Sequence, residues 1–313
     1  IFCLARSGDW NAAALSLATG ETLGFIAPAD ADLIARFLDP DLYEGEPDLP
    51  PPVPLTPLKF AMREAIAQPR PPGALPLAFA AVDLRRSAAW RSQLEAGERL
   101  VRSQAIDARI LIEAYTARKP AASGGIWNRA AAIQALDLAL LSSDGAAVAR
   151  ALPGAYAAMR EVALEVPFAK YFDERLAALA LPQTASGTAL RVALLASNYE
   201  TAPKRFDPAT QTAANRFLLG LARGNVHGLA PPGTLGEAIA AAFLRPMPEG
   251  ELFDLLTQKR LGEAVLKAIL MLKDEAFADP GDVQMALSTL RAVGLEEVAR
   301  RTAIQLLLLE RRG

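Results

Sequence analysis

Histidine and cysteine carry much of the nucleophilic catalysis in proteins, and this chain has one of each. Mechanisms of the Ser-His-Asp or Cys-His type need a histidine within hydrogen-bond reach of the nucleophile. His227 lies in a glycine-rich stretch between two expected helices, where a lone histidine indicates a surface or capping role. We expect Cys3 to be a buried free thiol, because free cysteine behaves as a small apolar side chain. Pairing with a cysteine upstream of Ile1 is the alternative.

Metal ligands and paired carboxylates are equally sparse. No Cys-x-x-Cys or His-Glu-x-x-His spacing occurs, so zinc lacks its usual nitrogen and sulfur ligands. Glu161 and Glu165 lie four residues apart, which predicts one shared helix face. An exposed, solvated pair is the favoured interpretation, and a glycoside-hydrolysing pair is the alternative, because sequence spacing does not show spatial pairing. The sequence therefore predicts no catalytic residue, no metal and no cofactor.

One expected helix start has residues that attract anions. The segment Ser123-Gly124-Gly125 precedes this helix, and Lys119, Ser123 and Asn128 lie around its free backbone amides. The segment is not a P-loop, since no strand is expected before it and no Gly-Lys-Ser/Thr follows. Simple helix capping is the alternative to anion binding.

The composition is that of a foldable chain without a charge surplus. Hydrophobic residues make up 52% of the 313 residues, aromatic residues only 6%, and the formal net charge is −2. Abundant small apolar side chains favour closely packed helices over a sheet sandwich. We expect no nucleic-acid partner, because such binders carry a basic surplus, and Arg85-Arg86 and Arg300-Arg301 read as solvated helix faces. No run reaches the ~18 apolar residues of a membrane span.

Apolar residues recur with helical spacing along the chain. Asp9, Asp30 and Asp144 occur where N-caps are expected, because their carboxylates accept hydrogen bonds from free first-turn amides. Near the end, an apolar stripe at i, i+3, i+4 and i+7 consists of Leu261, Ala264, Val265, Ala268, Ile269 and Leu272. Strand patterns are weak. The expected fold is all-α, with stacked antiparallel helical hairpins that form an irregular α-solenoid.

Proline-rich stretches suggest four segments. Residues 1–43 are expected to form an N-terminal helical hairpin that continues an upstream segment, and residues 44–57 a proline-rich linker. Residues 58–202 are expected to form a central helical array, and residues 203–313 a C-terminal helical bundle. The linker assignment rests on prolines, which remove backbone donors and favour an extended path. Thr201 to Pro208 is expected to be a second linker.

Two resemblances rest on short motifs. The residues Gly8-Asp9-Trp10-x-x-Ala13, followed by Leu15, Ala18 and Leu23-Gly24, resemble one tetratricopeptide-type hairpin. Through Cys3 to Ala14, Pro120 to Trp127 and Leu290 to Leu309, the whole chain resembles an uncharacterised alphaproteobacterial family of helical-repeat proteins. Some members carry the automatic label "antifreeze glycopeptide polymerase-related". The resemblance implies an exported helical protein of unknown activity, and it transfers no catalytic residue.

A helical chain so poor in chemical groups is best interpreted as a non-enzymatic scaffold that binds a protein or peptide partner. Solenoids bind such partners on a concave face without catalytic residues. The candidate binding residues, which are polar or aromatic and lie near helix starts and loops, are Trp10, Asn11, Lys119, Ser123, Asn128, Arg129 and Tyr199. The alternative is that each stabilises the fold, as a tryptophan does when it wedges between helices.

Two other function classes stay open. One is the non-catalytic helical part of a cell-wall or glycan-active enzyme, with the catalytic segment upstream. The other is a structural subunit of an envelope assembly, tethered by residues 47–57. Few cysteines, a start at Ile1 and the family resemblance favour the periplasm or cell envelope, with the cytoplasm as the alternative. We expect no transmembrane segment.

Overall fold

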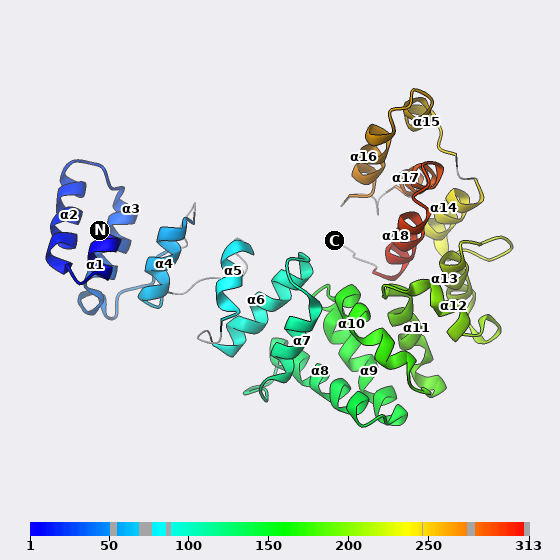
Figure 1. The fold of residues 1–313 in the computed structure, drawn as a ribbon, viewed down its shortest axis with the longest axis horizontal. Coiled ribbons are helices and arrows are strands. Elements are labelled where there is room, and N and C mark those ends of the chain that lie inside the picture. The colour runs from blue at the N-terminus through cyan, green and yellow to red at the C-terminus, as the bar shows by residue number, and fades with distance from the viewer. Residues whose placement is uncertain (51–54, 69–76, 86–88, 246, 274–278, 310–313) are drawn as a thin grey trace. The chain divides into compact units, whose positions relative to one another are not determined.

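The computed structural model describes residues 1–50, 55–68, 77–85, 89–245, 247–273 and 279–309. These residues form helices joined by turns and loops, with no strand among them (Figure 1). Most helices pack against a neighbour in the chain, such as α8 (Gly125–Leu141) against α9 (Gly145–Arg160), and α14 (Gly233–Leu244) packs mainly against α17 (Pro280–Ala292). The structure therefore confirms the expected all-α fold of solenoid-like helical hairpins.

The chain divides into two compact units, unit 1 (Ile1–Ile106) and unit 2 (Asp107–Gly313). The division falls within residues 58–202, which the sequence assigned to a single array. The four-segment organisation stays a prediction. Residues 51–54 of the proline-rich segment lie outside the described residues, as does Arg86.

Unit 1 consists of short helices with small shared cores. Its elements are α1 (Phe2–Arg6), α2 (Trp10–Thr22), α3 (Pro28–Leu38), the 3-10 turn η1 (Pro40–Tyr43), α4 (Pro57–Ala65), α5 (Leu77–Asp83) and α6 (Trp90–Arg102). The first four α-helices pack in chain order around buried residues that include Ala13, Leu33 and Phe37. Asp9 caps α2 as expected, by accepting a 3.2 Å hydrogen bond from the amide of Ala12.

The helix α3 begins earlier than the sequence indicated. It starts at Pro28, because proline has a fixed φ that suits the first helical position and lacks the amide that would stay unpaired there. Asp30 therefore lies inside the first turn, and its carboxylate pairs with Lys59 of α4 at 2.6 Å. The capping role expected for Asp30 is wrong, and this residue instead joins two helices.

Two arginines hold part of the proline-rich segment against unit 1. Arg36 of α3 donates to the carbonyl of Pro47 at 3.0 Å. Arg63 of α4 donates to the carbonyls of Leu49 and Pro50 at 2.9 and 3.2 Å. Prolines remove donors but keep their carbonyl acceptors, which a guanidinium with several N–H groups can satisfy. This part of the segment is therefore hydrogen-bonded to α3 and α4.

Unit 2 continues the helical pairs. Its elements are α7 (Ala108–Thr116), α8 (Gly125–Leu141), α9 (Gly145–Arg160), α10 (Glu165–Ala177), η3 (Gln183–Ala185), α11 (Ser186–Leu195), η4 (Tyr199–Thr201), α12 (Ala202–Arg205), η5 (Pro208–Thr210), α13 (Ala213–Arg223), α14 (Gly233–Leu244), α15 (Gly250–Thr257), α16 (Leu261–Met271), α17 (Pro280–Ala292) and α18 (Glu296–Leu308). Its most extensive helix pairs include α8 with α9, α14 with α17, and α10 with α11. Asp144 caps α9 as expected, by accepting from the amides of Ala146 and Ala147.

The expected second linker, Thr201 to Pro208, is a packed part of unit 2. It contains the helix α12, in which Ala202 and Pro203 are buried. Arg205 pairs with the buried Asp173 of α10 at 2.7 Å. The linker prediction is wrong because a proline in the first helical turn starts a helix as readily as it interrupts one.

Arginines of α17 and α18, the last two helices, donate hydrogen bonds to backbone carbonyls at the C-terminal ends of earlier helices. The last four carbonyls of a helix lack partners within that helix, and they form the negative end of its dipole. Arg291, at the end of α17, donates to the carbonyls of Ala242 and Phe243 in α14 at 2.9 and 2.7 Å. The same guanidinium lies over the Phe243 ring and pairs with Glu296 at 2.7 Å.

Arg300 and Arg301 of α18 act in the same way. Arg300 donates to a carbonyl in the last turn of α13 at 3.3 Å, and it pairs with Glu200 at 2.9 Å. Arg301 donates to the carbonyls of Ala196 and Ser197, the two residues that follow α11, at 3.4 and 3.2 Å. It also pairs with Glu297 at 2.6 Å. The expectation that Arg300-Arg301 is a solvated face is wrong, because both guanidinium groups bind backbone carbonyls of other elements. These carbonyls belong to residues far away in sequence, so local spacing did not indicate the contacts.

Replacing Arg291 with methionine removes the hydrogen bonds to α14 and the ion pair with Glu296. We expect the free energy of unfolding to fall by about 3 kcal/mol or more, since each of the two lost hydrogen bonds to a charged group contributes roughly 1.5–3 kcal/mol. Urea titration followed by circular dichroism measures the change. The matched control is Arg150→Met at an exposed position of α9, which we expect to change stability by less than about 0.5 kcal/mol. Equal losses in the two variants would contradict the capping role of Arg291.

Candidate functional site

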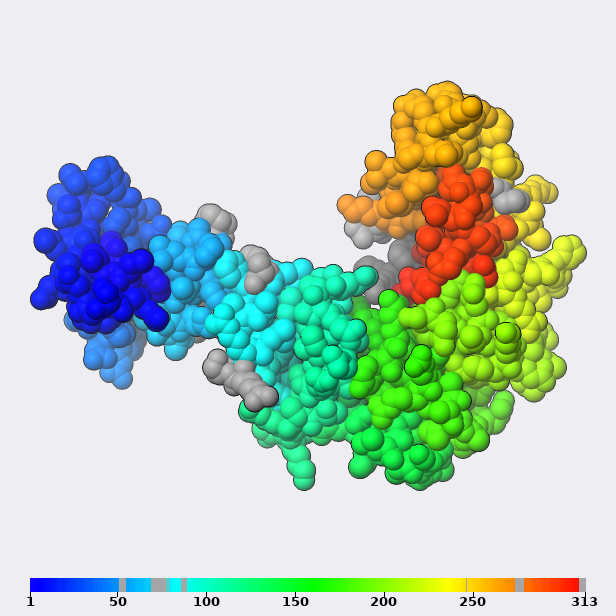
Figure 2. Space-filling view, viewed as in Figure 1, coloured from blue at the N-terminus to red at the C-terminus, as the bar shows by residue number. Residues whose placement is uncertain are grey.

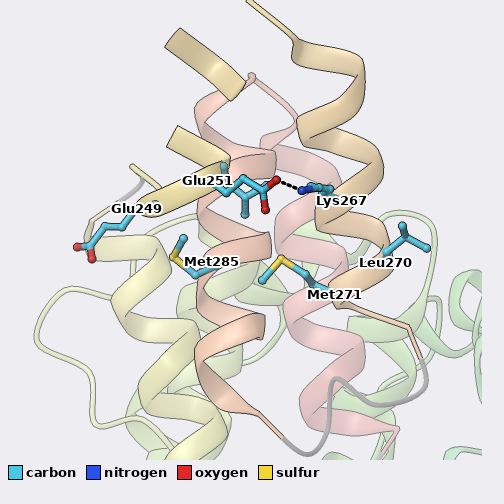
Figure 3. Close-up of a pocket in the computed structure, with 8 residues that line it drawn as sticks. Glu249, Glu251, Lys267, Leu270, Met271 and Met285 are labelled. Carbon is cyan, nitrogen blue, oxygen red and sulfur yellow. Dashed lines mark hydrogen bonds and ion pairs between the residues drawn. The ribbon is translucent and has the colours of Figure 1, made fainter. Parts of the chain in front are cut away.

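An open groove lies between α15, α16 and α17 of unit 2, with a volume of about 790 Å³ (Figure 3). Its lining residues are Glu249, Gly250, Glu251, Leu252, Lys267, Leu270, Met271 and Met285. We call it the α15–α17 groove. In the space-filling view, the orange atoms of α15 and α16 lie at the surface of unit 2 (Figure 2).

Small residues shape the helices around the groove. Gly250 starts α15 with a φ of +60°, a left-handed conformation that glycine adopts without strain. On α16, the fully buried positions are Ala264 and Ala268. Alanine permits a close approach between helices, so α16 packs tightly on α17 while its larger side chains lie elsewhere.

The larger apolar side chains of α16 point outward. Leu261 and Ile269 belong to the apolar stripe predicted from the sequence, and they are 53% and 54% exposed. Leu266 and Leu270 are 57% and 58% exposed. The predicted stripe therefore lies on a helix, with its alanines buried and Leu261 and Ile269 exposed. We call Leu266, Ile269 and Leu270 the α16 face, and Leu270 belongs to both this face and the groove.

One ion pair crosses the groove. Glu251 of α15 and Lys267 of α16 form it, as Figure 3 shows. Glu251 is mostly exposed, so solvent screening leaves the pair a small contribution to stability. The pair engages the only cationic side chain among the lining residues, and the second carboxylate, Glu249, points away from it (Figure 3).

The apolar part of the groove is rich in methionine. Met271 of α16 and Met285 of α17 pack against a small core that contains Leu252, Leu255 and Ala264. Figure 3 shows both thioether side chains beneath the Glu251–Lys267 pair. Methionine is unbranched and polarizable, so it adapts to differently shaped apolar guests. This part of the groove is therefore an apolar surface of adaptable shape.

The predicted binding residues of unit 1 lie on α2. Trp10 is half exposed, and its ring centroid lies 6.4 Å from that of Phe37 on α3. Asn11 is exposed on the same helix. The contact with Phe37 supports the interpretation that Trp10 wedges between helices.

The predicted anion-binding residues lie at the start of α8. Lys119 and Ser123 are exposed in the preceding loop, and Arg129 is partly buried on the helix. Asn128 accepts a 2.9 Å hydrogen bond from the amide of Gly124 through its side-chain oxygen. That bond supports the capping interpretation, and anion binding stays a prediction.

Tyr199 is packed in the core of unit 2. Its side chain is 1% exposed, the Arg301 guanidinium lies 5.0 Å from its ring centroid, and its hydroxyl donates to the carbonyl of Glu297 at 3.4 Å. Burial raises the pKa of Tyr199. The residue therefore contributes to the arginine contacts of α18 rather than to a surface.

The carboxylates Glu161 and Glu165 do not share a helix face. Glu161 is exposed at the end of α9, whereas Glu165 is buried at the start of α10. Ala163 between them has a φ of +54°, which turns the chain out of the first helix. The expected pairing is wrong because the four-residue rule applies only within one continuous helix.

Cys3 is exposed on α1, so the expectation of a buried thiol is wrong. Its helix has five residues and buries only Ala5. His227 is exposed, and its amide donates to the Asn225 side chain at 3.0 Å. Among the described residues, no group of three or more His, Cys, Asp or Glu is placed to hold a metal ion. No helix in this part of the chain is long and apolar enough to cross a membrane.

Sequence reasoning missed the lining of the α15–α17 groove. One signal was present: Leu266 and Leu270 lie outside the expected stripe, so α16 is apolar on more than one face. A helix that is apolar on all sides is normally covered on all sides. The groove itself had no local signal, because its lining comes from three helices.

No protein-family model, curated protein or solved structure shows a significant match to this chain.

Substitution of Tyr156 tests whether a buried hydroxyl without a hydrogen-bond partner lowers the stability of the fold. Its buried hydroxyl has no hydrogen-bond partner among the described residues, and burial, followed by the charge of Glu165, raises its pKa. A raised pKa gives stability that is complete below pH ~10 and is lost as pH rises through the folded-state pKa, because the unfolded chain releases its proton first. We expect Tyr156→Phe to be about 1 kcal/mol more stable at pH 7 and to lose less stability in alkali.

Urea titrations at pH 7 and in alkali measure both effects. Tyr171→Phe, at a partly buried position of α10, is the control. A loss of stability in Tyr156→Phe at pH 7 would show that the hydroxyl has a stabilising partner.

Proposed function

We propose that this chain is a non-enzymatic helical scaffold that binds an amphipathic helix of a partner protein in the α15–α17 groove. The observation that carries the proposal is the α16 face, on which Leu266, Ile269 and Leu270 are all more than half exposed beside an apolar groove. Single exposed leucines are ordinary on protein surfaces, but contiguous apolar patches mark interaction sites. Grooves lined by leucine and methionine are a known way to bind amphipathic helices.

The shape favours a helix over a small ligand. Small-molecule sites are concave and bury most of the ligand surface. The α15–α17 groove is open, and its apolar lining continues through Leu270 onto the α16 face. α16 has 11 residues and is about 16 Å long, which matches three turns of a guest helix lying alongside.

The charged residues of the groove lining indicate which side chains of a partner helix would complement it. The lining contributes two carboxylates and one ammonium group, and Glu251 already pairs with that ammonium group. A guest helix with apolar residues at i, i+3 or i+4, and i+7, and a Lys or Arg beside that stripe, complements this pattern. Exposed charges of this kind orient the partner and speed association more than they add affinity.

The proposal includes the bacterial cell envelope as the location. Its support is the family resemblance of the sequence. Fractionation of cells that produce the full-length protein tests this part separately from binding.

Binding is tested with a labelled helical peptide of about 14 residues, ~20 Å long, that carries a leucine stripe and flanking lysines. We expect Leu270→Glu to weaken binding at least about tenfold, or 1.4 kcal/mol, because it places a charge in the apolar contact. The control is Leu138→Glu, at a similarly exposed leucine of α8. Fluorescence anisotropy measures the affinity, and circular dichroism checks the fold of each variant.

A peptide with glutamate in place of the lysines tests the charge pattern, and we expect it to bind more weakly. The proposal is contradicted if the lysine peptide does not bind, or if Leu270→Glu and Leu138→Glu bind it equally well.

A further inference from the structure

The methionines of this chain fall into three environments. Met62 and Met159 are buried in helical cores, and Met247 is mostly exposed before α15. Met271 and Met285 are partly exposed, and both line the α15–α17 groove. Two methionine side chains from different helices are therefore partly exposed in the same apolar site.

We propose that Met271 and Met285 form an oxidation site that closes the α15–α17 groove to its apolar guest. The reagent class is a hydroperoxide, such as hydrogen peroxide. The consequence for binding rests on the function proposed above, whereas the reactivity of the two sulfurs does not.

The reaction is a two-electron oxygen transfer. The thioether sulfur attacks one oxygen of hydrogen peroxide and the O–O bond breaks. The second oxygen leaves as water after it takes the proton of the first, and methionine sulfoxide remains. Sulfur loses two electrons and the peroxide gains them. Reductases of methionine sulfoxide reverse the change, so the modification can act as a switch.

A sulfoxide changes the floor of the groove. Its oxygen is a strong hydrogen-bond acceptor, and the neighbouring apolar lining residues, Leu252 and Leu270, provide no side-chain donor. The one side-chain donor of the lining, Lys267, already pairs with Glu251. A guest helix that covers the groove would therefore remove water from this oxygen beside apolar side chains, which is unfavourable. Water satisfies the oxygen while the groove is open, so oxidation favours the unbound state.

Reactivity is tested first, by peroxide titration of Cys3→Ser protein and peptide-resolved mass spectrometry. We expect Met247 to gain an oxygen atom first, Met271 and Met285 next, and Met62 and Met159 last. The helical peptide should protect Met271 and Met285 but leave Met247 reactive. Oxidation of Met271 and Met285 as slow as that of Met62 and Met159 would overturn the inference.

The effect on binding is tested with Met271→Leu/Met285→Leu, because leucine keeps a similar apolar volume. We expect peroxide to weaken peptide binding about tenfold in the parent protein and in Met247→Leu, but not in the double variant. Circular dichroism after oxidation shows whether the helices stay folded.

The outcomes separate the two proposals. Peptide binding that Leu270→Glu abolishes but peroxide leaves unchanged overturns this inference alone. Absence of peptide binding before oxidation overturns the proposed function, and with it the switch.

Discussion

Hydrogen bonds from arginine to helix-terminal carbonyls determine how the C-terminal helices of unit 2 are held. Each helix ends with carbonyls that have no partner within that helix, and burying such groups unpaired is unfavourable. Arg291, Arg300 and Arg301 satisfy carbonyls at the ends of α14, α13 and α11, while Glu296, Glu200 and Glu297 balance their charge. A guanidinium with five donors can serve several carbonyls and a carboxylate together. Arg36 and Arg63 hold the proline-rich carbonyls of unit 1 by the same chemistry.

This arrangement leaves α16 with an apolar surface. α17 is held between α14 and α18, and α16 packs on α17 through buried alanines. The contacts that fix the position of α17 are therefore separate from the residues that line the groove. In the proposed function, a guest helix would cover Leu266, Ile269 and Leu270 without disturbing the arginine contacts.

The sequence predicted what depends on neighbouring residues. The helical fold and the caps at Asp9 and Asp144 follow from local spacing, and the structure confirms them. Contacts between residues far apart in the sequence could not be predicted from local spacing. Arg291, Arg300 and Arg301, for example, bind carbonyls 48 to 105 residues away. Local spacing also does not reveal which apolar side of α16 faces the core, because both sides are apolar. The groove depends on three helices, so no single motif encoded it.

Native-state hydrogen exchange tests the central claim, that α18 and the helices whose ends it binds form one cooperative structure. Amides of α18, α11 and α13 are compared at increasing denaturant. If the arginine contacts hold these helices together, their opening free energies agree within about 1 kcal/mol and they exchange as one unit. Exchange of α18 at a much lower opening free energy, while α11 and α13 stay protected, would show that the arginine contacts do not join these helices into one cooperative structure.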